Sequence, residues 1–277
     1  MSISSAGSNS RVRILLALPL TLLAASASAK DVVTYGQNPA DLIAHLDRLV
    51  AAYPDVIVGY DDTALILNNG VRLPLSDGRT DKTPDELLDE PDIGDMFAFP
   101  YPADAPAGQP PRDFDPGRIR VEPLFRALYG DCQKEEMWSR MRSIAWVPAH
   151  GGGTVSITTM NGADKALEAV SQELDKLPKA FGKYLVPLGG TYNCRLIAGT
   201  SRMSMHAYGA AIDLNTKYSA YWRWQKPGAD GLYKWTNQIP PEIVAIFEKH
   251  GFVWGGRWYH FDTMHFEYRP ELVVPTK

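Results

Sequence analysis

Two stretches of this sequence decide its fold: Ser204-Met205-His206-Ala207-Tyr208-Gly209-Ala210-Ala211-Ile212-Asp213 and Asp262-Thr263-Met264-His265-Phe266-Glu267. They place two imidazoles and up to three carboxylates among small and glycine residues. A catalytic zinc usually takes three ligands from His, Asp or Glu side chains and leaves a fourth position for water. The side chains of these two stretches match that requirement.

The spacing within each stretch adds a geometric condition. Residues seven or three apart on a straight strand face opposite ways, so the chain must bend within both stretches. We expect Gly209 to provide the first bend, with His206 on a turn and Asp213 on the strand that follows. In the second stretch, Asp262 should end a loop and His265 should begin a strand. Glu267 then shares a face with His265 and can orient an imidazole.

These residues resemble the D-alanyl-D-alanine carboxypeptidase and dipeptidase family of zinc peptidases, which includes phage-type L-alanyl-D-glutamate endopeptidases. The family pattern S-x-H-x-x-G-x-A-x-D matches Ser204, His206, Gly209, Ala211 and Asp213. Its second pattern, an acidic residue three before a histidine, matches Asp262 and His265. The flanking Trp254-Gly255-Gly256 and His265-Phe266-Glu267-Tyr268-Arg269-Pro270 look like the same branch. The resemblance is clearest from about residue 117 to the C-terminus.

The resemblance implies a role for each matched residue. His206, Asp213 and His265 would be the zinc ligands, and Asp262 the general base that takes a proton from the attacking water. A carboxylate close to a cation is ionised at neutral pH, so Asp262 can accept that proton and deliver it to the leaving amine. Many relatives carry Glu at this place, and the shorter Asp262 leaves the choice among carboxypeptidase, dipeptidase and endopeptidase open.

Three further residues are candidates for substrate contact, and one arginine is a candidate for catalysis. Family members use an arginine on the substrate carboxylate or the developing oxyanion, and Arg195 is the first candidate, with Arg202 its competitor. His260 either contacts substrate or belongs to a packed aromatic strand. Ser204 either ends a turn or hydrogen-bonds near the metal.

The function implied by the resemblance is zinc-dependent hydrolysis of amide bonds in peptidoglycan stem peptides. The rival hypothesis is a wall-binding protein that keeps the zinc site without turnover. A third hypothesis, an exported peptidase acting on ordinary proteins, has less support because nothing in the sequence indicates a long groove for L-peptides. Asp262 favours the enzyme, since a binding protein does not need a base.

The N-terminus predicts export. Arg11 and Arg13 precede an apolar run over 14–25, and the small-residue triplet 27–29 follows, which is the pattern of a cleavable secretory signal over residues 1–29. The run is shorter than the roughly 20 residues that a membrane-spanning helix needs, so we expect no stable membrane insertion after cleavage. The expected location is the periplasm or the cell exterior.

Charge and cysteine content narrow the function and compartment. Without the two signal-peptide arginines, 26 basic residues remain against 32 acidic ones, a formal charge of −6, and an acidic protein is a poor candidate for binding nucleic acid. Cys132 and Cys194 are the two cysteines of the chain, and export allows them to form a disulfide, the alternative being two buried thiols. A bridge would close a loop of about 62 residues, worth roughly 4 kcal/mol. The oligomeric state stays open.

Apolar periodicity predicts an α+β fold: a small, mainly antiparallel sheet flanked by helices, with the zinc site on the sheet. We expect helices over 38–53, 119–129, 163–177 and 240–251, with Asn161 and Asp164 at the start of the third. We expect a hairpin over 63–75 and strands over 154–158, 210–214, 252–254 and 264–268. Residues 76–116 should be irregular and lie on the surface. The expected organisation is a signal peptide at 1–29, an N-terminal extension over 30–116, and a zinc peptidase domain over 117–277.

Other histidines and the tryptophans are weaker candidates for function. We expect His45 and His150 to bind no metal and His250 to end a helix. Five tryptophans gather late in the chain, where they either pack in the core and its rim or form an aromatic wall beside the metal: Trp222, Trp224, Trp235, Trp254 and Trp258.

Overall fold

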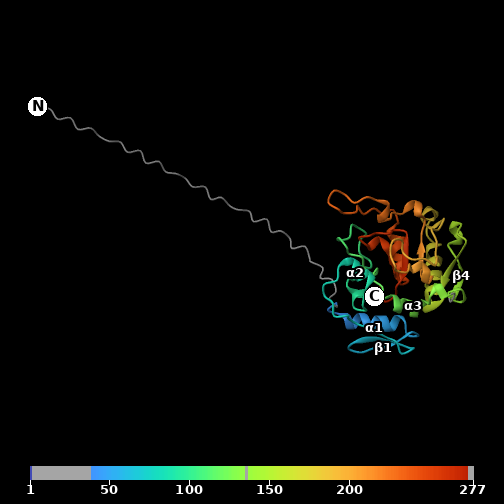
Figure 1. Ribbon diagram of the computed structural model, residues 1–277. Coiled ribbons are helices and arrows are strands. Elements are labelled where there is room, and N and C mark those ends of the chain that lie inside the picture. Colours follow the sequence, from blue (N-terminus) through green and yellow to red (C-terminus); the bar gives the residue numbers. More distant parts are fainter. Residues whose placement is uncertain (2–38, 135–136, 274–277) are drawn as a thin grey trace. The chain divides into compact units, whose positions relative to one another are not determined.

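The computed structural model describes Met1 and residues 39–134 and 137–273 (Figure 1). The predicted signal peptide therefore lies, except for Met1, outside the described residues. The helices of the described part are α1 (Leu42–Ala52), α2 (Pro84–Asp89), α3 (Glu122–Tyr129), α4 (Ala163–Leu174), α5 (Gly182–Leu185) and α6 (Pro241–Lys249). None of them is long and apolar enough to cross a membrane.

The strands of the described part form three small antiparallel sheets. The first contains β1 (Ile57–Tyr60), β2 (Ala64–Leu67) and β3 (Arg72–Pro74) in sequence order, the second pairs β4 (Met141–Ala145) with β5 (Thr154–Thr158), and the third has the order β6-β8-β7, from β6 (Ala211–Asp213), β8 (His265–Tyr268) and β7 (Phe252–Trp254). The predicted α+β class with antiparallel pairing is confirmed. The antiparallel strands are divided among three small sheets, and the metal-binding residues Asp213 and His265 lie on the third.

Two hydrophobic cores meet at the third sheet. One core joins α1, α3 and the first sheet, and the other joins α4, α6 and the second sheet. Successive residues of a strand point to opposite faces, so Ala211 packs in the first core and Ile212 in the second. Val253 and Trp254 divide between the cores in the same way. The third sheet is thus fixed from both faces, which gives its strands a rigid setting.

The N-terminal extension is part of the first core. We expected 76–116 to lie on the surface without a core, and this was wrong, because Ile93, Met96 and Phe97 are buried against α1 and α3. The stretch also contains the short helix α2, whose start is fixed by reciprocal hydrogen bonds between Thr83 and Glu86. Residues 76–116 contain many Pro, Asp and Gly residues, so no apolar periodicity indicated these short buried segments.

Hydrogen bonds also join the extension to the C-terminal part of the chain. The Tyr53 hydroxyl donates to Glu271 at 2.6 Å, and the Tyr101 hydroxyl donates to Glu248 at 2.7 Å. The side chains of Tyr53, Glu248 and Glu271 are buried, and that of Tyr101 is half-buried. Core packing and buried hydrogen bonds therefore join the chain before residue 117 to the chain after it.

Helix starts were predicted less well than helix positions. The helix predicted over 163–177 is α4, but Gly162 precedes it and provides no side-chain cap. Asn161 instead adopts a positive φ of 55° and donates its amide to the carbonyl of Leu128. The helix predicted from residue 38 begins at Leu42. The helix predicted over 240–251 is α6, and His250 follows its last residue as expected.

Cys132 and Cys194 form the disulfide that we predicted. Their Cα atoms lie 5.8 Å apart, and 62 positions separate them in the sequence. On the chain-entropy argument, closing a loop of that length stabilises the fold by roughly 4 kcal/mol. The bridge anchors the segment that leads through Arg195 toward the metal-binding residues.

Candidate active site

Strand pairing brings Asp213 and His265 together. In the antiparallel register of β6 and β8, Asp213 lies opposite His265, and Ala211 lies opposite Glu267. Directly opposed side chains share a face, with Cβ atoms roughly 5 Å apart. The small side chain of Ala211 leaves room for Glu267 beside the imidazole. The predicted sharing of one face by His265 and Glu267 is therefore observed.

A tight turn brings His206 to the same place. Residues Met205–Tyr208 form a turn of 3-10 helix, which begins where the Ser204 hydroxyl accepts a hydrogen bond from the His206 N–H. The turn ends at Gly209, whose φ of 64° favours glycine. A Cβ atom there would also lie 2.8 Å from the sulfur of Met141. The bend at Gly209 thus returns the chain to β6 as the sequence predicted.

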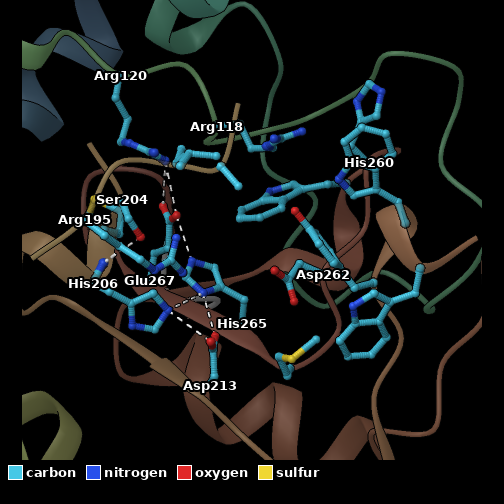
Figure 2. Close-up of a pocket in the computed structure, with 18 residues that line it drawn as sticks. Arg118, Arg120, Arg195, Ser204, His206, Asp213, His260, Asp262, His265 and Glu267 are labelled. Carbon is cyan, nitrogen blue, oxygen red and sulfur yellow. Dashed lines mark hydrogen bonds and ion pairs between the residues drawn. The ribbon is translucent and has the colours of Figure 1, made fainter. Parts of the chain in front are cut away.

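The three predicted ligands converge on one point (Figure 2). His206 Nε2 lies 3.2 Å from Asp213 Oδ2 and 3.2 Å from His265 Nδ1, and that Nδ1 lies 2.8 Å from Asp213 Oδ1. Ligands of a tetrahedral zinc, bound at about 2.0 to 2.1 Å, lie about 3.3 Å from one another. Two imidazoles and a carboxylate at this spacing suit a zinc ion with one open position.

The other nitrogen of each imidazole is held by the surrounding structure. His206 Nδ1 hydrogen-bonds the Thr191 carbonyl, and His265 Nε2 lies 3.0 Å from Glu267 Oε1. Glu267 in turn pairs with Arg120, whose Nη1 lies 3.2 Å from Oε1. Such outer contacts fix the ring orientation and leave the opposite nitrogen free for a metal.

Burial and ion pairing set the charges of these groups. Burial lowers the pKa of His265, but hydrogen bonds to Asp213 and Glu267 outweigh it and raise that pKa to about 10. Burial raises the pKa of Glu267, but Arg120 and His265 outweigh it and lower that pKa to about 2. The pKa of Asp213 is likewise lowered, because its hydrogen bonds to both histidines outweigh its burial. Without a cation, a proton on His265 therefore balances two carboxylates.

Asp262 lies on the same cavity as these ligands and has an unusual environment. Its Oδ1 is buried and has no hydrogen-bond partner among the described residues. Burial raises the pKa of Asp262 to about 7, although the charges of His265 and Arg118 lower it. A divalent cation nearby would lower this pKa further. With a cation bound nearby, the Asp262 carboxylate would therefore be ionised at neutral pH and able to accept a proton.

The cavity has a volume of about 320 Å³ and brings most of the predicted residues together. Arg195, Ser204, His260 and Asp262 line it with the metal-binding residues. Three of the five tryptophans also line it, so both interpretations of the aromatic cluster hold in part: Trp222, Trp224 and Trp258 line the cavity, whereas Trp254 is fully buried.

The competing arginine lies elsewhere. Arg202 lines a neighbouring cavity, and its Nη1 lies 3.4 Å from Asp89 Oδ1. Arg195 is exposed at the metal cavity, and its side chain donates to the carbonyl of Leu196. Of the two predicted arginines, Arg195 is thus the one placed to meet a substrate.

His45 and His150 lie outside the metal cluster. His45 Nε2 lies 3.2 Å from Asp41, and His150 Nε2 hydrogen-bonds the Leu174 carbonyl. His250 Nε2 lies 2.8 Å from Glu173. Each of the three therefore has a local partner that accounts for its position.

Sequence reasoning missed a group of residues from the N-terminal side of the cavity: Asp115, Arg118 and Arg120. Arg118 and Arg120 line the cavity. Asp115 accepts a hydrogen bond from the backbone N–H of His260 at 2.9 Å, and the Nδ1 atom of His260 lies 2.6 Å from Asp115 Oδ2. The available signal was the alternation Arg118-Ile119-Arg120, which places both guanidinium groups on one side of an extended chain. Figure 2 shows both arginines across the cavity from Asp213.

Residues 198–268 match the family model described as D-alanyl-D-alanine carboxypeptidase. The match contains both metal-binding stretches and ends with β8. It confirms over this segment the resemblance that the sequence motifs predicted, and it supports a peptidase. No curated protein shows significant similarity to the chain.

Proposed function

We propose that this chain is an exported zinc peptidase that hydrolyses amide bonds in peptidoglycan stem peptides. One observation carries the proposal. Ligand atoms of His206, Asp213 and His265 lie within 4.8 Å of one another, on the cavity that Asp262 also lines, in a segment that matches a peptidase family. A metal site with a carboxylate base beside it is the arrangement that metal-assisted amide hydrolysis requires.

The residues divide the work of hydrolysis between them. A zinc ion bound to the three ligands would supply a Lewis acid that polarises the amide carbonyl and acidifies the attacking water. Asp262 accepts a proton from that water at its carboxylate and delivers it to the nitrogen of the leaving amine. Glu267 and the Thr191 carbonyl keep the two imidazoles in position throughout.

Arg195 is the candidate for stabilising negative charge on the substrate. Arg195 lines the cavity, and within the described part of the chain its side chain donates one hydrogen bond, to the Leu196 carbonyl, so further donors are available. An arginine can donate two parallel hydrogen bonds to a carboxylate or to a developing oxyanion. The disulfide at Cys194 limits the movement of this exposed residue.

Two observations support the substrate class and the compartment. The matched family is described by its action on D-alanyl-D-alanine, and a cavity of about 320 Å³ suits a short peptide end. The signal-like N-terminus favours export, and the disulfide fits an oxidising compartment. The cell-wall peptide is the substrate that combines these features.

The direct test is digestion of purified peptidoglycan and synthetic stem peptides by the chain from residue 30, loaded with zinc. Mass spectrometry should find released D-alanine or a newly cut stem peptide, which also identifies the bond. Asp262→Asn should keep its zinc and lose roughly 10²- to 10⁴-fold in kcat, as expected for loss of a general base. Asp62→Asn is the matched control, because Asp62 is exposed and does not line the cavity.

Tight wall binding by the zinc-loaded protein, with no stem peptide cut, would favour the non-catalytic alternative. Full activity in Asp262→Asn would remove Asp262 from its assigned role while leaving the peptidase in place.

A further inference from the structure

Arg118 stands at the border of the metal cavity in a fixed position. Its Nη1 donates to Asp115 Oδ2 at 3.1 Å, and its guanidinium carbon lies 5.5 Å from the centre of the Trp258 ring. Its side chain is 15% exposed. Within residues 39–134 and 137–273, Asp115 is its one side-chain hydrogen-bond partner, so most of its N–H donors remain available.

The other arginines near the cavity are engaged in ion pairs or exposed to solvent. Arg120 is committed to Glu267 and, through Nη2, to the Met203 carbonyl at 3.3 Å. Arg202 pairs with Asp89 and lines the neighbouring cavity. Arg195 is exposed. Arg118 is therefore the cation of this group that is both held in place and free to bind.

A guanidinium held in this way is prepared to bind an anion. Its planar donors fit a carboxylate with two parallel hydrogen bonds, and an arginine fixed beforehand loses less conformational entropy on binding. Asp115 is shared between Arg118 and His260, so it neutralises the guanidinium only in part. The pocket around Arg118 is also lined by Trp258 and Tyr221, which reduce its exposure to water.

We infer that Arg118 binds a carboxylate of the peptide substrate and selects peptides that carry this group beside the scissile amide. The inference rests on the proposed peptidase function and deepens it, since it names a specificity-determining residue. Arg118 and Asp115 lie outside residues 198–268, so the family match assigns neither of them a role.

Two carboxylates of a stem peptide have the required chemistry. One is the C-terminal carboxylate of a D-Ala-D-Ala end, and the other is the α-carboxylate of γ-linked D-Glu. Binding of the first would make the enzyme a carboxypeptidase, and binding of the second would make it an endopeptidase.

The test compares four peptides with the zinc-loaded protein. L-Ala-γ-D-Glu-L-Lys-D-Ala-D-Ala is used as the free acid, as the C-terminal amide, with the D-Glu α-carboxylate amidated, and with both changes. Amidation of the recognised carboxylate should lower kcat/KM roughly 10- to 100-fold, mainly through KM, as expected for loss of a charged hydrogen bond. The position at which amidation acts identifies which carboxylate is bound.

Arg118→Gln should remove this discrimination by weakening hydrolysis of the acid to the level of the amide, with zinc content unchanged. Arg118→Lys keeps the charge without the planar fork and should be intermediate. Arg112→Gln is the matched control, because Arg112 is in the same segment with 63% of its side chain exposed. If Arg118→Gln does not fold, Arg118→Lys with the same four peptides decides.

Undiminished discrimination by Arg118→Gln, or no discrimination by the wild type, would overturn the inference. If the wild type cuts none of the peptides, the proposed function has failed, and the inference is judged on binding. Calorimetry would then measure the same peptides against the zinc-loaded Asp262→Asn chain with and without Arg118→Gln. A preference for the acid that depends on Arg118 would support the inference, and equal affinities would overturn it.

Discussion

The cavity has two sides that are built differently. The metal side, His206, Asp213 and His265, comes from one turn and two paired strands between the two hydrophobic cores. The arginine side, Asp115, Arg118 and Arg120, comes from an extended segment N-terminal to the residues that match the peptidase family. We propose that reactivity depends on the metal side and substrate selection on the arginine side.

The largest expected effect is the loss of zinc binding when a ligand on the metal side is changed. Asp213→Asn keeps the shape of the side chain but removes a negative charge that both imidazoles contact. Mutating a residue that only supports a metal ligand lowers metal affinity by up to roughly 100-fold. Because Asp213 is itself a proposed ligand, we expect a larger loss of zinc affinity in Asp213→Asn, and a parallel loss of hydrolysis. Zinc titration and peptide assays on the same preparation measure both. Retention of zinc with normal affinity would mean that the ligands lie elsewhere.

A smaller effect is expected from the residue that supports the metal side. Glu267→Gln weakens the contact to His265 Nε2 and leaves Arg120 without its charged partner. Metal affinity or activity should fall roughly 10- to 100-fold. Glu242→Gln, at an exposed position on α6, is the control. Equal values for both variants would show that Glu267 does not tune the metal.

The arginine side should respond in another way. Asp115→Asn weakens the hold on Arg118 and His260, so we expect KM to rise and unfolding stability to fall by about 1 to 3 kcal/mol. Zinc affinity should be unchanged, because Asp115 contacts no metal ligand. Calorimetric zinc titration and chemical denaturation separate the two quantities. If Asp115→Asn loses as much zinc affinity as Glu267→Gln, the arginine side also contributes to metal binding, and the separation of roles between the two sides is wrong.

The smallest effect is the release of protons on zinc binding. His265 has a pKa raised to about 10 and must lose its proton to bind a metal, so at pH 8 about one proton should be released. Asp262, with a pKa of about 7, should release a second proton at pH 6. Zinc affinity should therefore rise with pH. Calorimetry in buffers of different ionisation enthalpy counts the protons, and no release at pH 8 would contradict a protonated His265.

Local motifs explain why the metal side was predictable. Ser204, His206 and Gly209 form a turn through contacts only a few residues apart, and Gly209 has the positive φ that the turn requires. The apolar stripe of Ile243, Val244 and Phe247 likewise revealed α6. Such features are encoded within one segment, so a single sequence displays them.

The arginine side and the N-terminal extension could not be read in this way. His260 and Asp115 are 145 positions apart in the sequence, and no local pattern predicts their contact. The buried residues Ile93 and Phe97 lie in a stretch rich in Pro and Asp, where periodicity is absent. Their burial is decided by the tertiary fold, through α1 and α3.

X-ray absorption at the zinc edge on the zinc-loaded chain tests the central claim most directly. We expect one ion per chain, bound by two imidazole nitrogens and by oxygen ligands at about 2.0 to 2.2 Å. The imidazole contribution should halve in His206→Ala if any zinc remains. A spectrum with sulfur ligands, or one without imidazole scattering, would contradict the metal site on which this account depends.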